Sequence, residues 1–184
     1  MLTAALAPGC NSTGCTDNRS SLPLAGFYAF PSGTKISLDS LDLGGVDAPA
    51  DSLLVHSGQA AAQAYLPFRI DRESTSFFLH YDYPMQGLDN PAFNDTITFT
   101  YTAEPYFASE ECGAMYKYKV NGVTYTRHLI EQVEIADSTV TNVEMERFRI
   151  YFRVADGPAG DTDNDNTDTP QTPASAGARR ASRP

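Results

Sequence analysis

The chain has no tryptophan, only three cysteines, and no apolar run of the roughly 18–20 residues that a membrane-spanning helix needs. Basic residues are also few, since 13 Lys and Arg stand against 23 Asp and Glu and leave a formal net charge of −10. A nucleic-acid groove needs Lys and Arg to neutralise phosphates, so this balance argues against a nucleic-acid partner. No GxSxG elbow, HExxH helix, P-loop or GxGxxG turn occurs. These absences favour a non-enzymatic protein that uses no cofactor.

The residues that are present indicate strands. Ten Tyr and ten Phe accompany many Thr, Val and Ile, which are the types enriched in β-structure. TSFFLHYDY at 75–83 and TITFTYT at 96–102 alternate along their length, as half-buried strands do. Further short runs bring the predicted total to eight to ten strands at regular spacing, with no convincing helix. The pattern predicts one all-β domain, built as an antiparallel β-sandwich or a partly open barrel.

The clearest turn signal is Asn121-Gly122, which lies between two alternating runs. Asn and Gly both tolerate the positive φ that a two-residue type I′ turn requires. A turn here would pair Val120 with Val123 and would place the neighbouring Tyr side chains on the same apolar face. We therefore predict a hairpin centred on residues 121–122.

The N-terminal residues 1–10, MLTAALAPGC, are similar to the end of an export signal whose basic part would lie upstream of this start. The small residues before Cys10 resemble the lipobox of bacterial lipoproteins, in which the cysteine is acylated, although Pro8 departs from the usual pattern. The alternative is a disordered N-terminus with an incidental cysteine. If Cys10 carries acyl chains, Cys15 and Cys112 remain to form a disulfide in an oxidising compartment. Two buried free thiols are the alternative there.

Composition divides the chain into four segments. Residues 1–10 are the signal remnant, 11–25 a linker, 26–155 the β-sandwich domain, and 156–184 a tail. The tail has almost no large apolar side chains, so it cannot offset the entropy lost on ordering and is predicted to be disordered. Its aspartates suggest a calcium loop, but Asn166 and Thr172 stand where an EF-hand needs Gly and Glu. We predict no metal site.

Candidate catalytic groups are scattered. His56, His80 and His128 come from separate predicted strands, and only His80 and Asp82 share a strand face on which a carboxylate could orient an imidazole. No motif identifies a Ser or Cys as a nucleophile that would act together with these two residues. Glu110-Glu111 are adjacent, so in a strand they would point in opposite directions and would not form an acid pair for glycoside hydrolysis. We expect them in a loop, and we predict no catalytic residue.

Several segments occur together in this order: YLPFR at 65–69, DTITFTY at 95–101, SEECGAMYKY at 109–118, TRHLI at 126–130 and RIYF at 149–152. Together they resemble a family of small Bacteroidales-type envelope lipoproteins of unknown function. The resemblance implies an all-β domain, anchored to the outer membrane through a lipid on Cys10, with no catalytic residue to transfer. Surface lipoproteins of such bacteria often carry an acidic run after the acylated cysteine. None follows Cys10, so we expect the protein to face the periplasm.

Four short motifs are similar to the O-glycosylation acceptor of these bacteria, an Asp followed by Ser or Thr. Their hydroxyl residues are Ser40, Ser52, Thr96 and Ser138. The alternative is plain structure, because Asp-Ser and Asp-Thr are common in turns and at strand starts.

The leading functional hypothesis is a non-enzymatic lipoprotein that acts as a structural or interaction module of the cell envelope, with an unidentified envelope protein as partner. A second hypothesis is a small-ligand or glycan binder, with Tyr and Phe on outward strand faces as its platform. A third, a hydrolase, needs a pocket with converging titratable groups.

Overall fold

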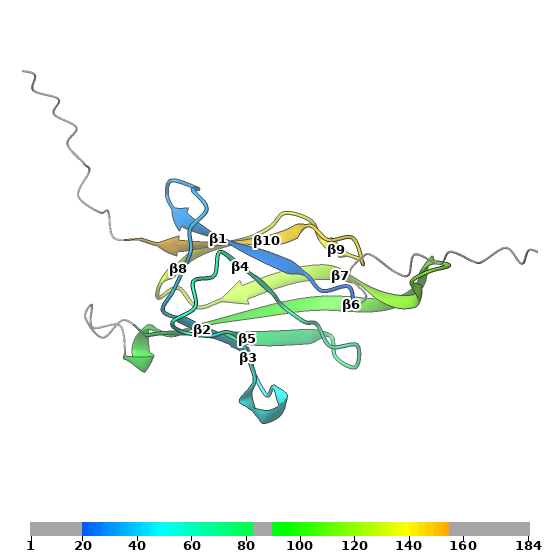
Figure 1. Ribbon diagram of the computed structural model, residues 1–184, viewed down its shortest axis with the longest axis horizontal. Coiled ribbons are helices and arrows are strands. Elements are labelled where there is room, and N and C mark those ends of the chain that lie inside the picture. The colour runs from blue at the N-terminus through cyan, green and yellow to red at the C-terminus, as the bar shows by residue number, and fades with distance from the viewer. Residues whose placement is uncertain (1–19, 83–89, 155–184) are drawn as a thin grey trace, which may run out of the picture.

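The computed structural model describes residues 20–82 and 90–154, which form two facing β-sheets (Figure 1). The four-stranded sheet consists, in order, of β4 (Gln63–Tyr65), β1 (Leu24–Phe30), β10 (Glu146–Arg153) and β8 (Ile130–Ile135). The six-stranded sheet consists, in order, of β3 (Leu53–Val55), β2 (Leu41–Gly45), β5 (Ser74–Tyr81), β6 (Asp95–Ser109), β7 (Gly113–Tyr125) and β9 (Thr139–Val140). The helical elements in these ranges are single 3₁₀ turns, η1 (Pro49–Asp51) and η3 (Pro91–Phe93). The predicted all-β fold class is confirmed.

The core lies between the two sheets and is made by the alternation seen in the sequence. In β6, Ile97, Phe99 and Tyr101 are buried, while the threonines between them face outward or are half-buried. Phe99 stacks on Phe148 of the opposite sheet, with ring centroids 4.3 Å apart. Burial of aromatic side chains is the main favourable term in such a sandwich, and stacked pairs add to it.

One strand pair is parallel. β1 pairs with β10 in parallel from Ala25↔Phe148 to Phe30↔Arg153, whereas all other ladders in the described residues are antiparallel. Parallel strands need a long crossover connection. Here that connection contains nearly the whole domain, because β1 and β10 are its first and last strands.

The predicted turn at Asn121-Gly122 is wrong. Strand β7 continues through both residues and stays paired with β6, with Tyr101 opposite Val120 and Thr100 opposite Gly122. Asn121 is therefore the extra residue of a β-bulge, and its side chain donates to Thr102 Oγ1 at 3.1 Å. The extra residue shifts the alternation by one position, so the apolar side chains before it and after it face the core together. A turn at the same place would produce the same pattern in the sequence.

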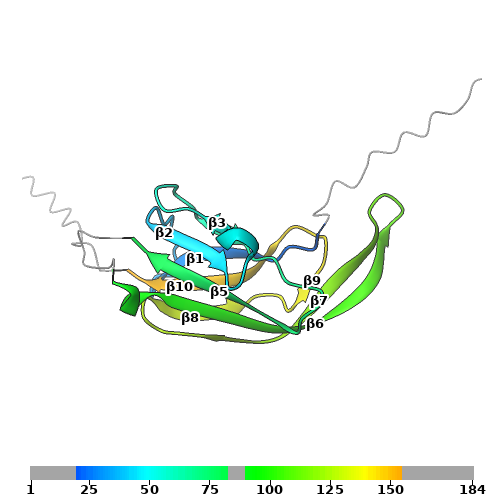
Figure 2. The same ribbon diagram turned by 90° about the horizontal axis from the view of Figure 1, so that it is seen from below.

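The hairpin turn lies ten residues earlier, at 110–112, and contains Glu110 and Glu111, as expected for loop residues. Pairing with β5 ends at Thr100, and β9 pairs only with Tyr118 and Lys119. Residues 104–117 therefore form backbone ladders only with each other. We call them the arm, and Figure 2 shows it curving away from the sandwich.

The described residues contain no helix with the length and apolar character needed to cross a membrane. β1 begins at Leu24, close to the predicted start of the domain. The predicted signal remnant and tail, at 1–10 and 156–184, lie outside the described residues.

Deleting Asn121 tests the bulge. The deletion makes Val120 and Gly122 adjacent, opposite Tyr101 and Thr100, so the ladder becomes regular and the same side chains face the core. The free energy of unfolding should therefore change by about 1 kcal/mol or less.

Deleting Thr98, which lies in a regular part of the same ladder, makes the buried Ile97 and Phe99 adjacent, so that one of them must turn outward. That deletion should cost about 3 kcal/mol or more. Urea unfolding of both variants measures the difference, and equal losses would contradict the bulge.

Candidate functional site

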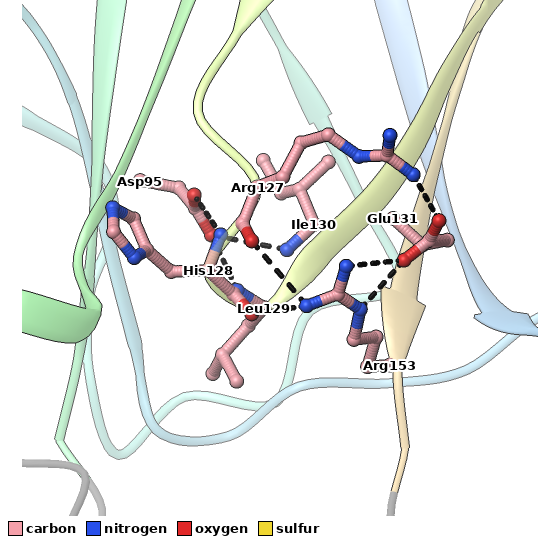
Figure 3. Close-up of polar contacts among 7 residues, drawn as sticks. All are labelled: Asp95, Arg127, His128, Leu129, Ile130, Glu131 and Arg153. Atoms are coloured by element: carbon pink, nitrogen blue, oxygen red, sulfur yellow. Dashed lines mark hydrogen bonds and ion pairs between the residues drawn. The ribbon is translucent and has the colours of Figure 1, made fainter.

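The most heavily hydrogen-bonded side chain described is Asp95, the first residue of β6, which is 1% exposed. Its carboxylate accepts from the hydroxyls of Tyr81 at 2.9 Å and Thr126 at 2.7 Å. It also accepts from three successive backbone N–H groups, those of His128, Leu129 and Ile130, at 2.9, 2.9 and 3.0 Å (Figure 3). A carboxylate can be buried only when it is satisfied in this way. Burial, and then the Asp95 charge, raise the pKa of Tyr81 well above its ordinary value.

The carbonyl groups of the same β7–β8 connection are held by Arg153 of β10. Its guanidinium donates to the carbonyls of Arg127 at 3.3 Å and His128 at 3.1 Å (Figure 3). Glu131 binds Arg153 at 2.6 Å and also pairs with Arg127. The hydrogen bond from Arg153, helped by the charge of Arg127, lowers the pKa of Glu131. The polar groups of this Asp95 cluster are used in holding the connection, so we assign the cluster a structural role.

The three histidines have different surroundings. His80 is exposed and its ring lies 4.5 Å from that of Phe78, while Asp82 accepts from the Ser57 hydroxyl at 3.2 Å. His56 follows β3, and His128 enters the Asp95 cluster through its backbone N–H. Within residues 20–82 and 90–154, no three His, Cys, Asp or Glu side chains gather as a metal-ion site.

Three of the four glycosylation candidates, Ser52, Thr96 and Ser138, are exposed, and Ser40 is half-buried. In two of the motifs the preceding aspartate has a structural role. Asp95 has been described, and Asp137 pairs with the buried Arg147 while accepting from the Thr139 N–H at 2.8 Å. Modification at these positions stays a prediction.

Cys10 and Cys15 lie outside the described residues, so lipidation and the pairing of Cys15 with Cys112 also stay predictions. Cys112 is in the turn of the arm, where its N–H donates to Ser109 Oγ at 3.1 Å. Its sulfur lies 3.8 Å from Asn142 Nδ2.

An apolar groove of about 310 Å³ lies along the β7 strand of the arm. We call it the arm groove, and its lining residues are Ser20, Leu22, Phe68, Ile70, Ala114, Met115, Tyr116 and Tyr118. Two of its large apolar side chains remain open to solvent, Ile70 at 58% and Tyr116 at 41%, and Phe107, which is paired with Ala114, is 68% exposed. Clustered exposure of large apolar side chains marks interaction sites on soluble domains.

The open backbone edge of the arm is protected against strand addition. Pro105 has no N–H to donate, and its neighbour Glu104 pairs with Lys117 at 3.2 Å. Proline and charge are common means of preventing edge-to-edge pairing. The groove, and not the edge, is therefore the better candidate for a binding surface.

A family model described as "Family of unknown function (DUF6452)" matches residues 40–152. The chain belongs to this family. The matched region runs from just before β2 almost to the end of β10, so it contains Asp95, the β7–β8 connection and the whole arm, and it ends one residue before Arg153. Comparisons with curated proteins and with solved structures find no match.

The structural role of Asp95 in this DUF6452 domain was missed from sequence, where the residue was considered only as part of a glycosylation motif. Alternation could have indicated it, because Asp95 is in phase with Ile97, Phe99 and Tyr101 and so belongs to the buried face. The arm groove had no comparable signal, since its residues come from separate parts of the chain.

Replacing Asp95 tests the cluster. Asp95→Ala leaves buried N–H groups and the Tyr81 hydroxyl without an acceptor, so the free energy of unfolding should fall by about 3–5 kcal/mol. The matched control is Asp71→Ala, at an exposed aspartate with no hydrogen bond in the described residues, which should change it by about 0.5 kcal/mol or less. Similar losses in the two variants would rule out the central role of Asp95.

The pKa of Glu131 makes a prediction about acid stability. Its folded value lies below the ordinary 4.5, so the ion cluster stabilises the protein above that pH. This stabilisation should be lost as the pH falls through the folded pKa. In Glu131→Gln, the decline of unfolding free energy between about pH 5 and pH 3 should be shallower than in the unmodified chain. Urea unfolding across this range measures both slopes, and identical slopes would contradict the assignment.

Proposed function

We propose that the chain is a non-enzymatic, lipid-anchored module of a bacterial cell envelope that faces the periplasm and binds an envelope protein through the arm groove. The observation that carries the binding role is the apolar groove along a projecting arm, with Ile70 and Tyr116 open to solvent. The anchor is supported by the lipobox-like sequence before Cys10 and by the resemblance to envelope lipoproteins.

The position of the groove suits a partner close to the membrane. Ser20 lines the groove, and the chain from Cys10 to Ser20 can span at most about 35 Å when fully extended. A lipid on Cys10 would therefore keep the arm groove within about that distance of the bilayer surface.

Charge indicates what the partner presents. Glu110 and Glu111 in the turn of the arm are exposed, and neither forms an ion pair with a described residue. A partner segment with one or two large apolar side chains and neighbouring Lys or Arg would complement both surfaces. Opposite charges across an interface raise the association rate more than the affinity.

The second candidate, a glycan platform, has its best support on the outer face of the four-stranded sheet. Tyr28 and Tyr151 lie there with ring centroids 5.5 Å apart. Their hydroxyls already donate to Glu146 at 2.7 Å and Glu134 at 2.9 Å, and Arg149 lies over the Tyr28 ring. Burial, followed by these carboxylates, raises the pKa of both tyrosines. Since these rings and hydroxyls are occupied, we rank the arm groove first.

A pair of matched variants tests the arm groove. Tyr116→Asp places a charge in the groove, while Phe93→Asp changes a side chain of similar exposure, 39% against 41%, in η3. Capture of a specific envelope protein from detergent-solubilised membranes should fall about tenfold or more for Tyr116→Asp and should be unchanged for Phe93→Asp.

Equal capture by both variants would remove the groove from the proposal. The anchor is tested separately, since Cys10→Ala should move the protein from the membrane to the soluble periplasmic fraction while leaving capture in detergent intact. Retention of Cys10→Ala in the membrane would contradict lipidation at that residue.

A further inference from the structure

A second cavity lies beneath the β2–β3 loop and shares Phe68 with the arm groove. It measures about 180 Å³, and its walls include Val46, Ala48, Pro49, Leu54, Pro67 and Phe77. These side chains are apolar, so the cavity offers water few hydrogen-bond partners. An apolar cavity of about 150 Å³ in another protein accepts benzene, so this one has room for a single six-membered ring or a branched aliphatic group of similar size.

The loop over this cavity has an uncommon backbone. Asp47, Ala50 and Asp51 have φ values of +58°, +55° and +50°, in the left-handed region that favours glycine. Such conformations persist where the surroundings enforce them, and they are concentrated at ligand sites. Arg69 supplies part of that enforcement, because its guanidinium donates to the Asp47 carbonyl at 2.7 Å.

The rim of the cavity is cationic in an acidic protein. A small polar hollow adjoins the cavity through Val46 and Thr75, and it is lined by Arg69, Arg72, Ser74 and Ser76. Asp47 is the one carboxylate residue in this lining, so the two arginines outnumber it.

These two arginines also lack the carboxylate partners with which most other described basic residues form ion pairs. Six of the Lys and Arg in the described ranges form ion pairs with carboxylates: Lys35, Lys117, Arg127, Arg147, Arg149 and Arg153. Arg69, Arg72 and Lys119 form none there, and two of these three are at this rim.

From this juxtaposition we propose that the β2–β3 cavity binds a small apolar carboxylate, with its ring or branched body in the cavity and its carboxylate on Arg69 and Arg72. The planar guanidinium matches a carboxylate through paired N–H donors, and the Ser74 hydroxyl can donate to the same anion. The carboxylate can belong to a free acid or to the C-terminal residue of a peptide. This site does not depend on the lipid anchor or on the arm groove.

The probe is phenylacetate, titrated into the ¹⁵N-labelled full chain and followed through amide chemical shifts. Binding should shift the amides of Val46, Thr75 and Phe77, with a dissociation constant of about 1–5 mM. Phenylacetamide keeps the ring without the charge, and acetate keeps the charge without the ring. Each should bind at least about fivefold more weakly, because each loses one half of the site.

Two variants separate charge from shape. Arg72→Gln should weaken phenylacetate binding about fivefold, whereas Lys119→Gln, the same charge change at the third unpaired cation, should leave it unchanged. Ala48→Leu fills the cavity and should abolish the shifts. Melting temperatures within a few degrees of the unmodified chain would establish that these variants are folded.

The peptide source is tested with a hexapeptide ending in Phe, as the free acid and as the C-terminal amide. Binding of the acid more tightly than phenylacetate would identify a protein C-terminus as the ligand, and binding of phenylacetate alone would identify a free acid. The proposal is overturned if no shifts appear at about 20 mM phenylacetate, if phenylacetamide binds equally well, or if Ala48→Leu is folded and still binds.

Discussion

A single buried carboxylate holds the β7–β8 connection, one of the six places where the described part of the chain passes from one sheet to the other. Asp95 begins a strand of the six-stranded sheet, yet three of its hydrogen bonds go to N–H groups that lead into β8 of the four-stranded sheet, those of His128, Leu129 and Ile130. Arg153 binds the carbonyls of the same connection from β10. With its N–H groups and carbonyls both engaged, the crossing has one well-defined path. The connection leads directly into β8, which pairs with β10, and β10 in turn pairs with β1.

Strand length separates the stable part of the molecule from its exposed part. β6 and β7 have 15 and 13 residues, whereas β5 beside them has eight. The half of β6 that pairs with β5 supplies core residues such as Phe99, and the other half, which pairs with β7 alone, continues into the arm. Large apolar side chains can therefore remain exposed on the arm without weakening the sandwich. Surface that contributes little to stability is free to serve binding.

The sequence allowed the local features to be predicted and left the non-local ones open. Alternation identified β5 and the first half of β6, because a period of two reports directly which face is buried. The same alternation was ambiguous at Asn121, where a bulge and a turn shift the phase equally. Arg147 belongs by alternation to an outward face, but Asp137 of a separate segment covers it. The pairing of β1 with β10, and both cavities, depend on contacts between residues far apart in the chain, for which a single sequence gives no signal.

The parallel pairing of β1 with β10 also bears on how the chain can reach its folded state. A polypeptide that crosses a membrane emerges from its N-terminus, so β1 would appear first and would have to wait for the last strand of the domain. Until then β1 has only β4 beside it, and much of its backbone hydrogen-bonding capacity and its apolar face stay open. Contacts of such large sequence separation form slowly. A chain of this topology therefore exposes an incomplete sheet to aggregation until its last strand has paired.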